Sequence, residues 1–214
     1  MRLSYSGWKT WDTCAAKYKY SYIDKLPRGP SHPAAARGTE IHGTIDKYLM
    51  GEVDEVHPEI KAKYGQWLQG LRDSDHELLP ERKFAFTENW EETDFNDPDA
   101  AWRGLLDLLV HPVGETFEWK TGGIYDEHGL QAELYGLTTL LLYPNNSQVT
   151  ITNVYLDKFK TKKRTYNRDD LPSLLAMWDH RREDLINDTL HSPNPGWYCR
   201  FCDFSKAQGG PCQF

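Results

Sequence analysis

The residues best placed to do chemistry lie on a short hairpin, where three charged side chains interrupt or follow apolar strands. Asp107 stands inside the apolar strand expected at 104–110, and Glu118 and Lys120 lie in the strand expected at 116–120. Burying a carboxylate among apolar side chains is costly unless its charge is compensated. Because side chains alternate along a strand, Glu118 and Lys120 share one face.

The turn of this hairpin decides which side chains face each other. A turn centred on Pro112 and Val113 sets Asp107 directly opposite Glu118, with Cβ atoms roughly 4.5–5.5 Å apart. A register slipped by two residues would instead pair Asp107 with Lys120 and still leave all three side chains on one face.

Two adjacent carboxylates need a cation, and hard oxygen ligands suit Mg²⁺ or Mn²⁺. Such an ion could activate a water and stabilise charge on a phosphate. Lys120 could position the nucleophile or stabilise the developing negative charge. The alternative is that Glu118 and Lys120 form only a solvated ion pair on the polar face of the strand.

Three further polar residues sit on predicted helices. His42 lies one residue beyond the apolar stripe of the helix expected at 35–49, so it can point to the edge of the core. Gln131 and Tyr135 are four residues apart and share a face of the helix expected at 131–143. Their structural alternatives are a core-edge histidine, a capping glutamine and a core tyrosine.

The elements around these residues alternate in type. Helices are expected at 8–22, 35–49, 58–73, 131–143 and 172–190, strands at 82–87, 104–110, 116–120 and 149–159, and a loop at Pro27, Gly29, Pro30 and Pro33. This order predicts one α/β domain with a mixed sheet over residues 1–214.

Composition excludes several classes of protein. With 39% hydrophobic and 27% charged residues, the chain is neither disordered, collagen-like nor a coiled coil. No apolar run approaches the roughly 18 residues of a membrane span. The first residues lack the apolar core of a secretory signal, so we expect a protein of the reducing cytoplasm.

The charges are segregated along the chain. The net charge of −7 argues mildly against a nucleic-acid partner, but residues 88–99 carry six acids and residues 158–168 carry six bases. The basic stretch and the first helix are either solvated surface or a DNA-binding face. The candidate DNA contacts are Lys17, Tyr18, Lys158, Lys160, Lys162, Lys163 and Arg164.

Four cysteines form a candidate metal-ligand set. Cys199 and Cys202 make a C-x-x-C, Cys212 follows ten residues later, and Cys14 lies near the N-terminus. Four thiolates suit a [4Fe–4S] cluster or a structural Zn²⁺ ion. Free thiols or a disulfide are the remaining alternatives.

Together the motifs resemble the PD-(D/E)XK nuclease superfamily, and most closely its RecB-like branch. The resemblance rests on Gly38-x-x-x-His42, on Gly104-Leu105-Leu106-Asp107, on Glu118-Trp119-Lys120 and on Gln131-x-x-x-Tyr135, in that order. It implies a restriction-endonuclease-like core with a mixed sheet flanked by helices.

The resemblance also implies roles for these residues. His42, Asp107, Glu118 and the Trp119 carbonyl would bind the metal, and Lys120 would serve catalysis. Gln131 and Tyr135 would lie near Lys120 or the DNA. Glu81, just before the first strand, is similar in place to an accessory acid of the branch.

The cysteine pattern is similar to that of the branch's iron–sulfur members. There a [4Fe–4S] cluster ties the chain ends together, which implies that residues 1–30 and 191–214 form one iron–sulfur element. Aromatic side chains could shield such a cluster from water; they are Trp197, Tyr198, Phe201 and Phe204.

The function that the resemblance implies is a Mg²⁺- or Mn²⁺-dependent DNA nuclease. We expect an exonuclease acting on single-stranded DNA or DNA ends in recombination, repair or DNA processing. Its partner would be a recombination or CRISPR-adaptation protein, and its location the cytoplasm, that of the host if a phage encodes it. The alternatives are a cluster- or zinc-stabilised nucleic-acid-binding or adaptor module with a vestigial nuclease site, and a zinc-stapled domain of another purpose.

Overall fold

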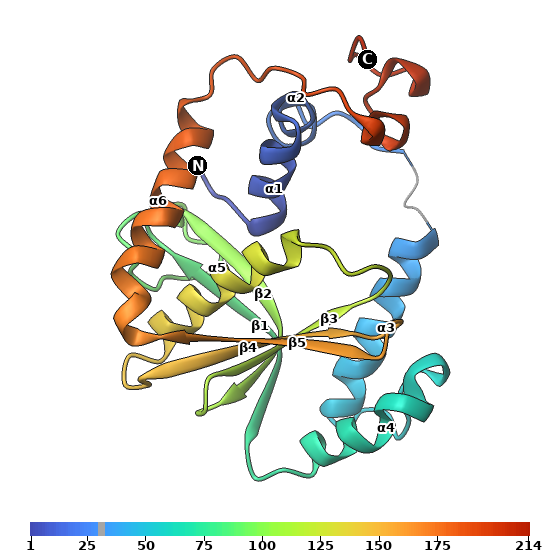
Figure 1. Ribbon diagram of the computed structural model, residues 1–214, viewed down its shortest axis with the longest axis vertical. Helices are drawn as coiled ribbons and strands as arrows, with labels where there is room; N and C mark the ends of the chain where they lie inside the picture. Colours follow the sequence, from blue (N-terminus) through green and yellow to red (C-terminus); the bar gives the residue numbers. More distant parts are fainter. Residues whose placement is uncertain (30–32) are drawn as a thin grey trace.

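A mixed sheet runs through the protein, with helices on both of its faces (Figure 1). The computed structural model describes residues 1–29 and 33–214, so Pro30 of the expected loop lies outside the described residues. The strands lie in sequence order across the sheet, and only the β3–β4 pair is parallel among the described strands. They are β1 (Glu77–Phe86), β2 (Trp102–His111), β3 (Glu115–Lys120), β4 (Gln148–Tyr155) and β5 (Lys160–Asn167).

The helices divide between the two faces of this sheet. The main helices are α1 (Tyr5–Thr13), α2 (Ala15–Tyr18), α3 (Pro33–Leu49), α4 (Pro58–Arg72), α5 (Glu127–Leu142) and α6 (Leu171–Asn187). A π-helical turn at Lys19–Ile23 follows α2, and short 3₁₀ turns lie at Arg168–Asp170, Trp197–Phe201 and Lys206–Gln208. None of the helices in the described residues combines the length and apolar character that a membrane span requires.

The α/β architecture with a mixed sheet is confirmed, and several boundaries differ from the expectation. The first strand, β1, begins at Glu77 rather than at residue 82, so Glu81 lies inside this strand and not before it. The expected first helix is broken at Cys14, whose backbone is extended between α1 and α2. The strand expected at 149–159 ends at Tyr155, and the basic stretch after it forms a further strand, β5. Because β5 is a sheet edge made largely of Lys and Thr, it carries no apolar alternation by which the sequence could reveal it.

The hairpin register is the predicted one. Leu108 pairs with Phe117 and Leu109 with Thr116, which centres the turn on residues 112 and 113. The slipped register, with Asp107 opposite Lys120, is therefore excluded.

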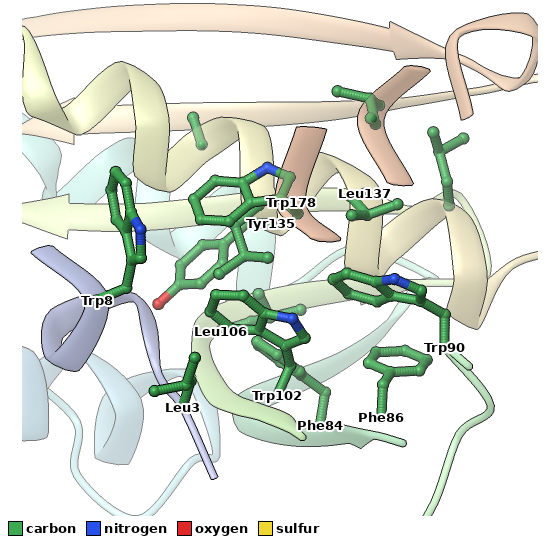
Figure 2. Packing of buried hydrophobic residues seen from close by; sticks show 14 of the residues in the cluster. Leu3, Trp8, Phe84, Phe86, Trp90, Trp102, Leu106, Tyr135, Leu137 and Trp178 are labelled. Carbon is green, nitrogen blue, oxygen red and sulfur yellow. The ribbon is translucent and has the colours of Figure 1, made fainter. Parts of the chain in front are cut away.

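Two apolar cores hold the sheet between its helices. The first lies under α1, α5 and α6 and is rich in tryptophan; Figure 2 shows Trp8, Trp102 and Trp178 packed together. The Trp178 ring lies 5.3 Å from that of Trp8 and 5.5 Å from that of Trp102, both edge to face. The second core lies under α3 and α4, where Ile41 and Ile45 meet the other face of the sheet.

A close cross-strand contact explains the glycine at position 104. Gly104 pairs with Phe84 on β1, and a Cβ atom added to Gly104 would lie 2.5 Å from the Phe84 ring. We expect Gly104→Ala to lower the free energy of unfolding by about 1–3 kcal/mol, as overpacked cores do. Denaturant titration would measure the change.

The matched control is Gly43→Ala in the middle of α3, where an added Cβ meets nothing within 4 Å. That change should stabilise the fold by about 0.5–1 kcal/mol, because alanine restricts the unfolded chain. Equal effects of the two substitutions would show that the Phe84 ring does not require a glycine beneath it.

Candidate active site

The candidate site lies where β2 and β3 part. Their paired residues end at Leu108 and Phe117, so the strands form a fork at the next positions, Asp107 and Glu118. One Asp107 oxygen, Oδ2, accepts the backbone N–H of Trp119 at 2.8 Å. We call this place the fork. The Asp107 and Glu118 side chains within it are 14% and 6% exposed.

A backbone irregularity on β1 lies opposite Asp107. Pro80 pairs with Leu108 and Arg82 with Leu106, whereas Glu81 between them has a left-handed backbone with φ of 50°. Such a conformation is uncommon for a residue with a side chain and costs on the order of 1 kcal/mol. Across this position Leu106 joins the core under α5, while Leu108 joins the core under α3. Asp107 therefore lies at the point on β2 where the core-facing side chains change from one face of the sheet to the other. From there it is within reach of helices on both faces.

Helix α3 brings a histidine to the fork from one face. His42 Nδ1 lies 3.6 Å from Asp107 Oδ2, and burial lowers the pKa of the imidazole. A neutral imidazole keeps a lone pair for a metal ion. The next turn of α3 adds Asp46, where burial and then the nearby Glu81 carboxylate raise the pKa to about 7. We did not predict Asp46 from the sequence, although its spacing of four residues from His42 was a signal.

Helix α5 brings a glutamine and a tyrosine from the other face. Lys120 Nζ donates to Glu118 Oε1 at 2.9 Å and to Gln131 Oε1 at 2.6 Å. The Gln131 amide donates to Glu118 Oε1 at 2.9 Å and to the Tyr135 hydroxyl at 3.0 Å. Gln131 is thus a link between Lys120, Glu118 and Tyr135 rather than a helix cap, and the Glu118–Lys120 pair is largely buried rather than solvated.

The positive charge around the fork does not fully compensate its two carboxylates, Asp107 and Glu118. Burial and, for Glu118, the neighbouring Asp107 carboxylate raise the pKa of each to about 7. The second Glu118 oxygen, Oε2, is buried and has no hydrogen-bond partner among the described residues. A divalent cation would satisfy this oxygen, so the donor set fits one, although no group of three or more His, Cys, Asp or Glu side chains in residues 1–29 and 33–214 is arranged to hold a metal ion.

The basic candidates for DNA contact separate onto two faces of β5. Arg164 lies over Gly129 of α5, which places Lys160, Lys162 and Arg164 on the α5 face by strand alternation. Lys163 points to the opposite face and pairs with Glu115 at 3.0 Å. Lys158 precedes the strand, in the turn after β4, and is exposed.

The candidates on the first helix do not face the fork. Tyr18 is 3% exposed and belongs to the core under α1, so the expectation that its ring stacks on a base is at odds with its burial. The aromatic–lysine pattern could not reveal which face of the helix packs inward. Lys17 is half-buried and lines a small cavity beside the cysteines.

All four cysteines line that one small cavity, together with Tyr20, Tyr198 and Phe204. Backbone N–H groups donate to Cys14 Sγ from Asn194 at 3.4 Å and to Cys199 Sγ from Gly196 at 3.3 Å. The cysteines are free and half-buried in the described structure. As the side chains stand they form no metal-binding group in the described ranges, so an iron–sulfur element is not supported by the arrangement itself.

The segment around Cys14, between α1 and α2, meets the C-terminal tail at this cavity (Figure 1). The Asn194 side chain and the Tyr198 hydroxyl both donate to the Thr13 carbonyl, at 3.0 and 3.3 Å. Of the aromatic residues expected to shield the cysteines, Phe204 is buried, whereas Trp197 and Phe201 are 73% and 68% exposed.

Comparison with known proteins identifies the family and the fold. A sequence model of the PD-(D/E)XK nuclease superfamily matches residues 2–207. The solved structure of SSO0001 is 14% identical, with a TM-score of 0.51 over 100% of this chain and 87% of that one. The solved structure of a candidate exonuclease from Eubacterium rectale is 12% identical, with a TM-score of 0.58 over 97% of this chain and 87% of that one. At these identities the two likenesses concern the fold alone, and no curated protein matches the chain.

The raised pKa of Asp107 predicts a pH-dependent stability. Because the folded pKa of about 7 lies above the ordinary 3.8, the folded protein binds more protons than the unfolded chain between these values. Stability therefore falls as the pH rises from about 4 to about 7. Asp107→Asn removes this loss, while its amide oxygen can still accept the Trp119 N–H.

In EDTA, we expect Asp107→Asn to be more stable than the wild type at about pH 8, by about 1 kcal/mol or more, and equally stable at about pH 4. Urea unfolding at several pH values measures both. A wild type more stable than Asp107→Asn at the higher pH would contradict the raised pKa.

Proposed function

Because the chain belongs to the PD-(D/E)XK nuclease superfamily, we propose that it is a Mg²⁺- or Mn²⁺-dependent deoxyribonuclease whose active site is the fork. The observation that carries the proposal is the difference in environment between the two carboxylate oxygens of Glu118. One of its oxygens is held by Lys120 and Gln131, and the other is buried without a partner in the described structure. An anionic ligand with one oriented and one free oxygen is suited to a hard cation.

The metal ligands that we propose come from both sides of the fork. Asp107 and Glu118 supply carboxylate oxygens, the backbone of β3 supplies the Trp119 carbonyl, and α3 supplies the neutral His42 imidazole. When bound, the ion would supply an activated water and a positive charge beside the phosphate.

Lys120 is the proposed catalytic residue. Its side chain is 14% exposed and its ammonium group is fixed by two hydrogen bonds, so its position is set before substrate binds. From there it can orient the attacking water or stabilise the negative charge that develops on the phosphate. Gln131 holds the ammonium group directly, and Tyr135 holds Gln131 through its hydroxyl.

We further propose that the enzyme is an exonuclease acting on single strands or DNA ends, in recombination, repair or DNA processing. The structural neighbour described as a candidate exonuclease supports this proposal through its fold. A partner from recombination or CRISPR adaptation belongs to the same proposal. The alternative is a nucleic-acid-binding or adaptor module with a vestigial nuclease site, and the presence of Asp107, Glu118 and Lys120 together argues against it.

Charge removal within β3 tests the active site with a matched control. Glu118→Gln and Lys120→Ala should each reduce cleavage of end-labelled DNA by at least about 100-fold in Mg²⁺ or Mn²⁺. Glu118→Gln should also weaken Mn²⁺ binding measured by calorimetry. Glu115→Gln lies on the same strand but faces Lys163 on the opposite side, so its cleavage rate should match that of the wild type. Wild-type protein that binds DNA and cleaves none would favour the adaptor.

For the cysteine cavity we propose a [4Fe–4S] cluster, with structural Zn²⁺ as the alternative, bound by Cys14, Cys199, Cys202 and Cys212. The proposal is supported by the convergence of all four thiols on one cavity and by the N–H donors that already point at two sulfurs. The bound group would then join residues 1–30 to residues 191–214.

Cys14→Ala tests this proposal by metal content rather than by activity. The variant should lose iron and sulfide, or zinc, and unfold more readily by about 2–4 kcal/mol, since it opens a very long cross-linked loop. Thr13→Ala is the control, because its backbone carbonyl still accepts the bonds from Asn194 and Tyr198. Full metal content in the Cys14→Ala protein would exclude Cys14 as a ligand.

A further inference from the structure

Arg164 on β5 is a half-buried cation that forms no ion pair with any residue in the ranges 1–29 and 33–214. Its Nη1 is buried and has no hydrogen-bond partner within the part of the chain that the structure describes. The guanidinium lies against the first turn of α5, where its Nη2 would be 3.0 Å from a Cβ atom added to Gly129. A buried donor left unsatisfied is destabilising, so the group is suited to an anion that is not part of this chain.

The surroundings of Arg164 are also positive. His128, at the start of α5, has its pKa lowered to about 4 by burial and then by Lys120, Lys162 and Arg164. These three cations come from β3 and β5, and each faces α5. The imidazole itself is held by the Tyr155 hydroxyl at 3.3 Å. The first turn of α5 therefore stands beside a concentration of positive charge in an otherwise acidic protein.

The strand register gives the distance of this charge from the fork. Glu118 pairs with Asn153 on β4, and Asn153 pairs with Lys162 on β5. Lys162 thus lies two strand spacings, roughly 10 Å, from the proposed metal ligand. Asn153 between them is 1% exposed, and its amide donates to the His128 carbonyl. A phosphate at Arg164 and Lys162 would belong to a nucleotide that neighbours the scissile one.

An exposed aromatic ring completes the arrangement. Tyr125 is 57% exposed and packs edge to face on His128, with ring centroids 5.4 Å apart. It lies in the loop between β3 and α5, whose Gly122 N–H is anchored by Asp157 at 2.7 Å. Its ring is available to stack on an unpaired base, an interaction that does not depend on sequence.

We propose that Arg164, Lys162 and Tyr125 form a nucleotide subsite beside the fork, in which the two cations hold a backbone phosphate and the Tyr125 ring stacks on the unpaired base. The inference rests on the proposed nuclease function and deepens it, because the subsite selects single-stranded substrate. A base that remains paired within a duplex does not offer its face to the ring, so the subsite favours single strands or frayed ends.

The cationic part is tested by binding without cleavage. Fluorescence anisotropy with a single-stranded oligonucleotide in EDTA gives Kd at several salt concentrations. Arg164→Gln and Lys162→Gln should each raise Kd by roughly fivefold or more and reduce the slope of log Kd against log salt by about 0.7, the value for one lost phosphate contact. Lys163→Gln removes the same charge from the opposite face of the strand and should stay within about twofold of the wild type.

The aromatic part is tested with abasic substrates. Tyr125→Ala should weaken binding of the intact strand by roughly fivefold to a hundredfold, and Tyr125→Phe should bind like the wild type. An oligonucleotide with one abasic position, moved along the strand, should at one position bind the wild type and Tyr125→Ala equally. Trp197→Ala, which removes an exposed ring beside the cysteines, should bind the intact strand and every abasic oligonucleotide like the wild type.

The outcomes separate the subsite from the nuclease. If the wild type cleaves DNA but Arg164→Gln and Lys163→Gln bind alike, or no abasic position cancels the effect of Tyr125→Ala, the subsite is overturned and the proposed function stands. If the binding results hold but the wild type cleaves no nucleic acid, the subsite stands and the proposed function fails. Melting temperatures near that of the wild type, measured for each variant, exclude loss of fold as the cause.

Discussion

The hydrogen bond from the Trp119 N–H to the Asp107 carboxylate is the interaction around which the site is built. It takes the place of backbone pairing where β2 leaves β3, so the backbone N–H of Trp119 keeps a hydrogen-bond acceptor where the strands separate. Because the strands part at this point, side chains from both faces of the sheet can meet between them. His42 arrives from α3 and Gln131 from α5, which a continuous sheet would keep apart.

Burying two carboxylates in the fork lowers the free energy of unfolding, and interactions elsewhere in the molecule must offset this loss of stability. The two apolar cores supply the stabilisation, with fully buried tryptophans on both sides of the sheet. Their rigidity also fixes the donors, because Lys120 and Gln131 stand on a central strand and a packed helix rather than on loops. The protein thus concentrates its unfavourable electrostatics at one place and surrounds it with close packing.

The sequence predicted the centre of the site better than its periphery. Turn chemistry at residues 111–114 favoured the register that brings Asp107 to Glu118, and the structure has that register. Side-chain alternation alone could not exclude a slip of two residues, because that slip leaves the same side chains on the same face. The contribution of Asp46 and the place of His128 depend on how helices pack on the sheet, which no local pattern records. The expectation that Tyr18 contacts DNA is at odds with its burial for the same reason, because the neighbouring lysines do not indicate toward which side of the helix its ring points.

The position of β5 at the edge of the sheet has a consequence for how the protein behaves at high concentration. An edge strand exposes a row of free backbone donors and acceptors, which can recruit a strand from another molecule. Lysines along the edge oppose such recruitment, because two copies brought together would place like charges side by side. Their charge therefore opposes self-assembly into extended sheets, whether or not a ligand binds the strand.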